Sequence, residues 1–325
     1  MEWRAAEGAR LMVWAWYPAQ GTPRLEPVWP ASWADKRRAV LSRRLGAQAA
    51  EAMTGVREWR LTDAPLARSS SPFPVLIFSP GLSWLPPDYS ALAASLASRG
   101  LIVFGVAAPG FAGPLVYPDG TVSEQTLGPA DQAVWEQSIR FAAARLRTLN
   151  HDSASPFCRR LDLSRLGLFG HSLGGAASMA VAADTPEVSA AANLDGDFMG
   201  AAREVRPAQP LLLLSFAPGS RDGLPLLERM GLERSERRRS SDWLSVASRS
   251  ASAQRYFLDG ASHLDVLDAA LAAGDLIPER LRANRFGPSP AGRTLAAAAA
   301  LLDAFFRRTP LAAAAAAHPA LRPAP

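Results

Sequence analysis

The chain has 325 residues, a net charge of +5 and 48% hydrophobic residues, which is enough apolar material for a large buried core. Lys36 is the only lysine, so the basic charge is almost all arginine; together with abundant alanine, this indicates codon composition rather than a nucleic-acid-binding surface. The single cysteine, Cys158, excludes an intrachain disulfide.

Membrane-spanning and exported proteins carry long apolar runs, which this sequence lacks. No run of about 18 uninterrupted apolar residues occurs, so we expect no transmembrane helix. The first apolar run, residues 11–17, is too short and starts too late to be a signal peptide. The cytoplasm is therefore the expected default location, and a trimmed secreted product would show the same sequence.

The first half of the chain alternates between predicted strands and predicted helices. The run PVLIFSP at residues 74–80 is apolar throughout, which is typical of a strand buried on both faces. Asp88 is expected to cap the helix that follows and Gly100 to end it. A long Gly- and Pro-rich loop follows at residues 107–130, and such loops are usually functional. Strands are predicted at residues 9–18, 59–61, 74–80 and 101–106, and helices at 34–52, 89–99 and 130–149.

The second half continues the alternation, and its last residues differ in composition. Strands are predicted at residues 165–169, 188–194, 210–216 and 253–258, and helices from residue 173, over about 224–250, and at 264–273 and 294–307. Buried strands that alternate with helices predict an α/β fold with a mostly parallel central sheet and helices on both faces. We expect one domain over residues 1–308, with helical insertions at about 31–52 and 224–250, and a disordered Ala/Pro tail over 309–325.

The segment Gly170-His171-Ser172-Leu173-Gly174 lies where a predicted strand turns directly into a predicted helix. Such a corner leaves no room for side chains two residues before and after the serine, and both positions are glycine. A Gly-rich turn that only packs a helix on a sheet is the alternative interpretation. The strand-turn-helix context favours a serine nucleophile whose hydroxyl points out of the sheet edge.

A serine nucleophile needs a histidine base, and the chain has four histidines. His171 adjoins the serine and is expected to shape the turn, His151 lies in a polar loop and His318 in the tail. His263 remains; it follows a predicted strand and lies downstream of the candidate acids, in the Ser, Asp, His order of α/β-hydrolases.

The acid is ambiguous from spacing alone. Asp195 directly follows one strand and Asp222 follows the next, where many hydrolases keep their acid. Asp197 and Asp265 are interpreted as helix-capping carboxylates. Because Asp222 is separated from its strand by a Gly/Pro loop, while Asp195 ends its strand directly, loop geometry favours Asp195.

Stabilising the oxyanion requires two backbone amides, which we assign to Leu173 and to Leu82 in the loop after the 74–80 strand. Trp84 is then expected to wall the acyl pocket, and Phe198 with Met199 to shorten it. No Cys/His cluster, calcium-loop spacing or phosphate loop is present, so neither a metal nor another cofactor is expected.

The sequence resembles the platelet-activating factor acetylhydrolase family of α/β-hydrolases and its bacterial esterase relatives over about residues 10–265. The resemblance rests on the segments VWAWYPA, DAPLA, FPVLIFSPGL, LDLSRLGLFGHSLGGAA, AANLDGDFMG and DGASH. It implies that the acid is Asp195, which matches an LD-containing motif of the family. The chain departs from the family's S-H-G oxyanion motif, because Pro80 replaces the histidine.

Together these patterns predict a metal-independent serine esterase with Ser172, His263 and Asp195 as its triad, acting on short-acyl small-molecule or lipid esters. Polyester hydrolysis, thioester cleavage or acyl transfer by the same triad is the alternative chemistry, and a catalytically silent binding module is the alternative class. The basic run at residues 234–239 is predicted to be a solvated helix face, with transient contact to an anionic lipid surface as the minor alternative. The oligomeric state stays open.

Overall fold

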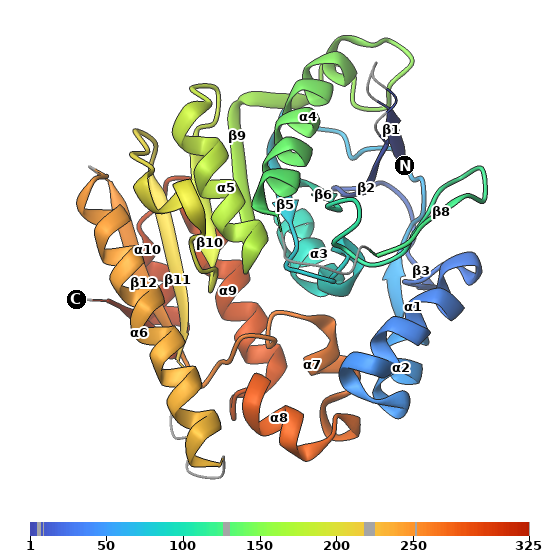
Figure 1. Cartoon of the computed structure of the whole chain (residues 1–325). Helices are drawn as coiled ribbons and strands as arrows, with labels where there is room; N and C mark the ends of the chain where they lie inside the picture. The colour runs from blue at the N-terminus through green and yellow to red at the C-terminus, as the bar shows by residue number, and fades with distance from the viewer. Residues whose placement is uncertain (5–7, 9, 126–130, 218–224, 251, 325) are drawn as a thin grey trace.

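A computed structural model describes residues 1–4, 8, 10–125, 131–217, 225–250 and 252–324. Its centre is a nine-stranded sheet in the order β1-β2-β6-β5-β9-β10-β11-β12-β13 (Figure 1). The six strands from β6 to β12 run parallel, and antiparallel strands lie at both edges. The sheet strands are β1 (Glu2–Arg4), β2 (Arg10–Trp16), β5 (Phe73–Ser79), β6 (Ile102–Val106), β9 (Leu161–His171), β10 (Ala190–Leu194), β11 (Leu211–Ala217), β12 (Ala253–Asp259) and β13 (Leu321–Pro323).

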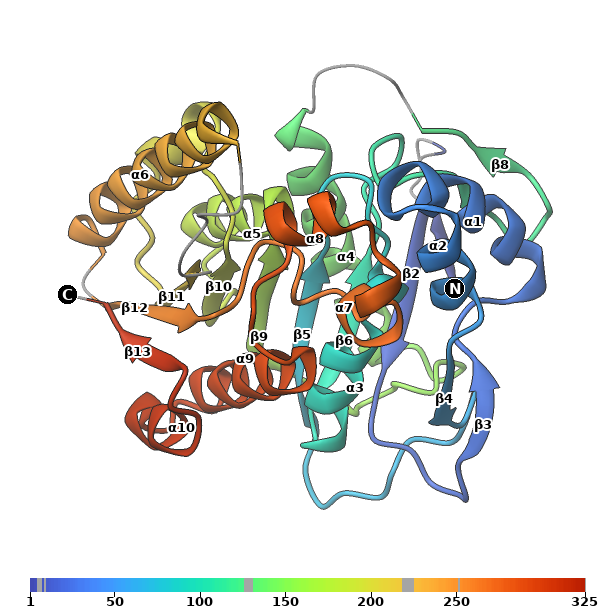
Figure 2. The same ribbon diagram turned by 90° about the horizontal axis from the view of Figure 1, so that it is seen from below.

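Helices cover both faces of this sheet, as the sequence predicts for an α/β fold. Helices α4, α5 and α6 lie on one side, and α3, α9 and α10 on the other (Figure 2). The bounds are α3 (Ser90–Ser98), α4 (Gln132–His151), α5 (Leu173–Asp184), α6 (Leu226–Ser248), α9 (Ala291–Phe306) and α10 (Leu311–Ala317).

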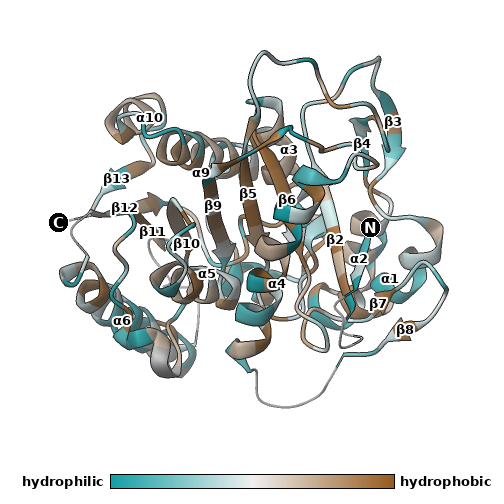
Figure 3. Ribbon diagram, turned by 90° about the horizontal axis from the view of Figure 1, so that it is seen from above, coloured by the Kyte–Doolittle hydropathy of each residue, from teal (hydrophilic) through white to brown (hydrophobic). Residues whose placement is uncertain are grey.

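The apolar strands explain why both faces are covered. Side chains alternate along a strand, so Leu76 and Phe78 of β5 enter the core under α3 and α9, while Val75 and Ile77 enter the core under α4 and α5. All seven residues of β5 are buried. The hydrophobic colouring of the central strands in Figure 3 follows this pattern, and the prediction of a doubly covered strand is confirmed.

Smaller elements surround the sheet. The predicted helix at 34–52 is two helices, α1 (Ala31–Leu45) and α2 (Ala47–Thr54), because Gly46 takes a φ of +89° between them. A 3-10 turn (Pro86–Tyr89) precedes α3, and the predicted loop 107–130 contains the hairpin β7 (Leu115–Val116) and β8 (Val122–Ser123). Strands β3 (Arg24–Pro27) and β4 (Arg57–Arg60), on either side of α1 and α2 in the chain, pair antiparallel in a separate two-stranded sheet.

The C-terminal segment differs from the expected disordered tail. Residues 311–317 form α10, and β13 pairs antiparallel with the edge strand β12. Apolar burial explains the order, because Leu311 and Leu321 are each 4% exposed within the core beside α9.

Short helices α7 (Asp268–Ala272) and α8 (Glu279–Arg285) follow β12, and only the first falls within a predicted helix. In Figure 1 these two helices lie at the same end of the sheet as α1, α2 and one end of α6. No helix among the described residues is long and apolar enough to cross a membrane.

Candidate active site

The serine lies at a tight corner between β9 and α5. β9 ends at His171, α5 begins at Leu173, and Ser172 between them has a φ of 54° and a ψ of −127°. A non-glycine residue rarely adopts this strained conformation, and it persists only where the surroundings enforce it. A Cβ at Gly170 would lie 2.3 Å from the Gly174 carbonyl carbon, so glycine is required there.

The neighbouring histidine is part of the core. His171 is fully buried, and its Nδ1 lies 2.8 Å from the Tyr89 hydroxyl. Burial holds the pKa of His171 well below its usual value, so its ring is neutral at ordinary pH. Its ring centroid lies 4.5 Å from that of His263, against which it packs.

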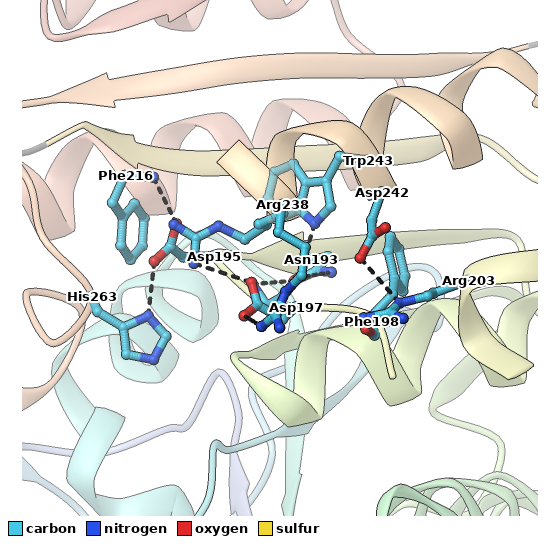
Figure 4. A network of polar contacts seen from close by, with 12 residues as sticks. Asn193, Asp195, Asp197, Phe198, Arg203, Phe216, Arg238, Asp242, Trp243 and His263 are labelled. Carbon is cyan, nitrogen blue, oxygen red and sulfur yellow. Dashed lines mark hydrogen bonds and ion pairs between the residues drawn. The ribbon is translucent and has the colours of Figure 1, made fainter. Parts of the chain in front are cut away.

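Asp195 and His263 form a direct pair at the carboxyl ends of β10 and β12 (Figure 4). His263 Nδ1 lies 2.8 Å from Asp195 Oδ2, and the Phe216 N–H donates to Asp195 Oδ1 over 3.0 Å. Asp195 has a φ of 54°, which turns the chain at the strand end. The Asn193 side chain braces the turn by accepting from the Gly196 N–H at 2.9 Å.

The charge state of Asp195 depends on its partners. Burial alone would raise the pKa of this carboxyl, but the positive charge of Arg239 and the hydrogen bond to His263 outweigh burial and hold the pKa below its usual value. Arg239 Nη2 lies 3.1 Å from Asp195 Oδ1. The carboxylate therefore stays ionised although Asp195 is only 2% exposed.

The loop that carries His263 is held by a second carboxylate. Asp265 Oδ2 accepts from the N–H groups of Ser262 and Gly287, each at 2.7 Å. Burial raises the pKa of Asp265 to about 6, while the two amides oppose this shift. The helix-capping role predicted for Asp265 is thus a loop-bracing role, because the amides that it binds belong to the His263 loop and the residues after α8.

The loop after β5 lies beside the nucleophile, since a Cβ at Gly81 would lie 3.0 Å from Ser172 Cβ. Four of its five amides have partners: Gly81 N–H donates to Tyr89 Oη, Ser83 N–H to Phe111 O, Trp84 N–H to Gly81 O, and Leu85 N–H to Asp88. Among the described residues, the Leu82 N–H takes part in no such bond. Leu82 is 37% exposed, so its amide is on an accessible loop.

Ser172, Asp195 and His263 border a cavity of about 410 Å³. The sequence-predicted residues Ser172, Leu173, Asp195, Phe198, Met199 and His263 all line it. Residues of α6 and α8 also line it, among them Leu232, Glu236, Arg238, Arg239, Asn284 and Arg285. The structure thus brings together serine, histidine and carboxylate at one hollow, where Nε2 is the ring nitrogen of His263 that Asp195 leaves unused.

Two predicted residues that the structure describes, Leu82 and Trp84, are not among the residues that line this cavity; Leu82 lies in the neighbouring loop after β5. Trp84 is 4% exposed and lies in the core, where the Arg37 and Arg44 guanidinium carbons are each 5.6 Å from its ring centroid. Its prediction as a pocket wall was wrong, because the loop turns its side chain inward to fill space beside α1. Asp222, the alternative acid, lies outside the described residues.

Sequence reasoning missed Arg239. The basic run was predicted to be solvated, yet Arg239 is 8% exposed and pairs with Asp195 and Asp197. A signal was present, since Trp243 lies four residues further on and so marks an apolar face of the helix. No group of three or more His, Cys, Asp or Glu side chains gathers as a metal site in the described part of the chain.

Comparisons with known proteins agree with this fold. A family model for platelet-activating factor acetylhydrolase, isoform II, matches residues 11–108. None of the curated proteins matches the chain. Among solved structures, a ferulic acid esterase from Streptomyces cinnamoneus is similar, with 25% sequence identity and a TM-score of 0.72 over 98% of this chain and 90% of that chain.

The sheet topology and the strand-turn-helix corner at Ser172 define the class, and the chain is an α/β-hydrolase. Within that class it is a carboxylic ester hydrolase of the serine esterase type, similar to the platelet-activating factor acetylhydrolases and to the ferulic acid esterase. The resemblance drawn from the sequence motifs is confirmed.

Proposed function

We propose that Ser172, His263 and Asp195 form the catalytic triad of this esterase. The observation that carries the proposal is the 2.8 Å contact between His263 Nδ1 and Asp195 Oδ2 on the wall of the same cavity as Ser172. In such a triad the carboxylate orients the imidazole, and the imidazole takes the serine proton.

The proposed reaction has two stages. Ser172 Oγ attacks the ester carbonyl carbon while its proton passes to His263 Nε2, and the alcohol leaves with that proton as the acyl-enzyme forms. Water then adds to the acyl-enzyme, gives a proton to His263, and releases the acid as Ser172 recovers its proton. The strained turn that places Ser172 between β9 and α5 supports its role as the nucleophile.

The amides of Leu82 and Leu173 are proposed as the oxyanion hole. Leu173 is the first residue of α5, where amides lack helix partners and the helix dipole favours negative charge. Leu82 supplies the one amide of its loop that the described hydrogen bonds leave unused. One lost oxyanion donor costs about 10² to 10³ in kcat in a well-studied protease.

Short-acyl small-molecule or lipid esters are the proposed substrates, since Phe198 and Met199 still border the cavity. Esters of aromatic acids such as ferulate are the second candidate. They are favoured by the ferulic acid esterase that this chain resembles and by Phe216, a further aromatic lining residue. Polyester and thioester hydrolysis use the same triad, and a silent binding module would need none of it.

Fluorophosphonate labelling separates the enzyme from the silent module. The wild type is expected to label stoichiometrically, and Ser172→Ala to lose labelling and about 10⁴-fold or more of its ester turnover while its circular dichroism stays unchanged. Near-normal turnover in folded Ser172→Ala would sink the mechanism. A p-nitrophenyl ester series from acetate to laurate, run beside methyl ferulate, then ranks the substrates; a maximum at twelve carbons would reject both candidates.

A further inference from the structure

Helix α6 is fastened to the loop that carries Asp195. The Trp243 indole N–H donates to the Gly196 carbonyl over 2.9 Å, and Arg239 Nη1 donates to Asp197 Oδ1 over 3.3 Å. Residues four apart share one face of a helix, so Arg239 and Trp243 together point at this loop. Figure 4 shows Trp243 and Asp197 in the same polar network as Asp195.

Arg239 differs from its neighbours on α6 in what it touches. Its side chain is 10% exposed and contacts Asp195, whereas the side chain of Arg237, two residues earlier, is 73% exposed and pairs with Glu233. A buried guanidinium is costly to desolvate and is retained where it meets an anion. The burial of Arg239 is therefore coupled to the Asp195 carboxylate.

The two oxygens of Asp195 have separate tasks. Oδ2 faces His263 Nδ1, and Oδ1 receives both the Phe216 N–H and the Arg239 guanidinium. The Phe216 N–H is a neutral donor and offsets only part of the cost of burying this carboxylate. The Arg239 guanidinium adds a second, charged donor on Oδ1, which restrains the carboxylate further and compensates its charge.

We propose that Arg239 is a positioning residue for the esterase reaction, holding the Asp195 carboxylate in place and in its charged form so that His263 stays oriented toward Ser172. The inference rests on the proposed triad. Helix α6 would then both line the cavity and hold the acid of the proposed triad through Arg239.

Charged and titratable groups face Asp195 from several elements. These are His171 at the end of β9, His263 in the loop after β12, Asp197 in its own loop, and Arg239 with Arg238 from α6. His171 is neutral because burial lowers its pKa, and Arg238 pairs with Asp197 at 3.3 Å. Among the described residues, Arg239 is therefore the arginine in direct contact with the Asp195 carboxylate.

The test compares Arg239→Met and Arg239→Lys with Arg237→Met, the matched control on the solvent side of the same helix. We expect Arg239→Met to lower kcat by about ten- to hundredfold with a smaller change in KM, because the chemical step depends on imidazole orientation. Arg239→Lys should recover part of that loss by restoring the charge. Arg237→Met should match the wild type.

The pH profile separates positioning from a structural role. Without the guanidinium the Asp195 carboxyl takes up a proton more readily, so the acid side of the kcat/KM profile of Arg239→Met should shift to higher pH. A purely structural role would lower the number of sites titrated by fluorophosphonate while kcat per titrated site and the pH profile stay unchanged. That result would overturn the proposal.

A double-mutant cycle tests the route of the effect. In an Asp195→Asn background, Arg239→Met should change kcat by less than about twofold, since the group through which Arg239 acts is already altered. An undiminished loss in that background would also overturn the proposal. A failure of the proposed triad would be seen separately, because the single variant Ser172→Ala would then keep its ester turnover.

Discussion

Two buried arginine–aspartate pairs flank the candidate site, and they differ in what the aspartate does next. On the acid side, Arg239 of α6 meets Asp195; on the oxyanion side, Arg37 of α1 meets Asp88. Arg37 and Asp88 are 1% and 0% exposed, and both arginines come from helices that the sequence predicts as insertions. Each helix thus places a buried guanidinium against a loop that borders the nucleophile.

The oxyanion-side pair forms a closed network. Arg37 donates to both oxygens of Asp88 and to the Ser83 carbonyl, and Asp88 Oδ2 accepts from the Leu85 N–H at 2.7 Å. Burial raises the pKa of Asp88 in spite of Arg37. This pair holds the shape of the loop that carries Leu82, and none of its charge faces the cavity.

In the acid-side pair, Arg239 contacts one of the two carboxylate oxygens of Asp195. Asp195 Oδ2 is left for His263, which is 26% exposed on its side chain, and the pKa of Asp195 lies below its usual value rather than above it. The two arginine–aspartate pairs therefore differ in role. Arg37 with Asp88 stabilises the backbone of a loop, whereas Arg239 with Asp195 leaves one carboxylate oxygen available to His263. Three substitutions test this contrast.

The largest effect is expected for Asp195→Asn. Loss of the carboxylate that orients the histidine should lower kcat/KM by about 10³- to 10⁴-fold. Asp222→Asn should lose less than about tenfold, or about 1.4 kcal/mol of barrier. Both variants are measured on one short ester, and the reverse ranking would move the acid to Asp222.

Arg37→Met tests the buried hydrogen-bond network between Arg37 and Asp88. Leaving Asp88 buried without its partner should cost about 3 to 5 kcal/mol in the free energy of unfolding, while kcat per fluorophosphonate-titrated site falls by less than about tenfold. Arg38→Met on the same helix is the control, because Arg38 pairs at the surface with Asp35 and Glu51. Equal stability of the two variants in urea titrations would contradict a structural role for Arg37.

Asp265→Asn shows what burial does to a carboxylate held by amides rather than by arginine. The pKa of Asp265 is raised to about 6, so its contribution to stability is full below about pH 4 and is lost as pH rises through 6. A neutral asparagine keeps an oxygen for the Ser262 and Gly287 amides and avoids that loss.

The stability of Asp265→Asn relative to the wild type should therefore increase by up to about 3 kcal/mol between pH 4 and pH 7. Urea unfolding across this range measures the difference. A difference that stays constant or falls with pH would show that burial does not penalise the Asp265 charge.

Much of the site could be predicted because its signals are local. The glycines around Ser172 reflect a corner with no space for a Cβ, and the position of Asp195 directly after a strand reflects the sheet edge. Trp84 was misplaced because the direction of a loop side chain depends on what packs beside it, here the arginines of α1. The order of residues 311–323 was missed because alanine-rich composition does not reveal the strand edge that they cover.

The sequence by itself determined the α/β class, the strained corner at Ser172, and the chain order of serine, aspartate and histidine, since backbone conformation and strand ends follow from nearby residues. Only the tertiary structure decided which of the 34 arginines would meet Asp195 and which would face water. Arg237 and Arg239 have the same side chain and lie two residues apart. The rotation of α6 over the sheet buries one and exposes the other, and that rotation is set by packing between distant segments.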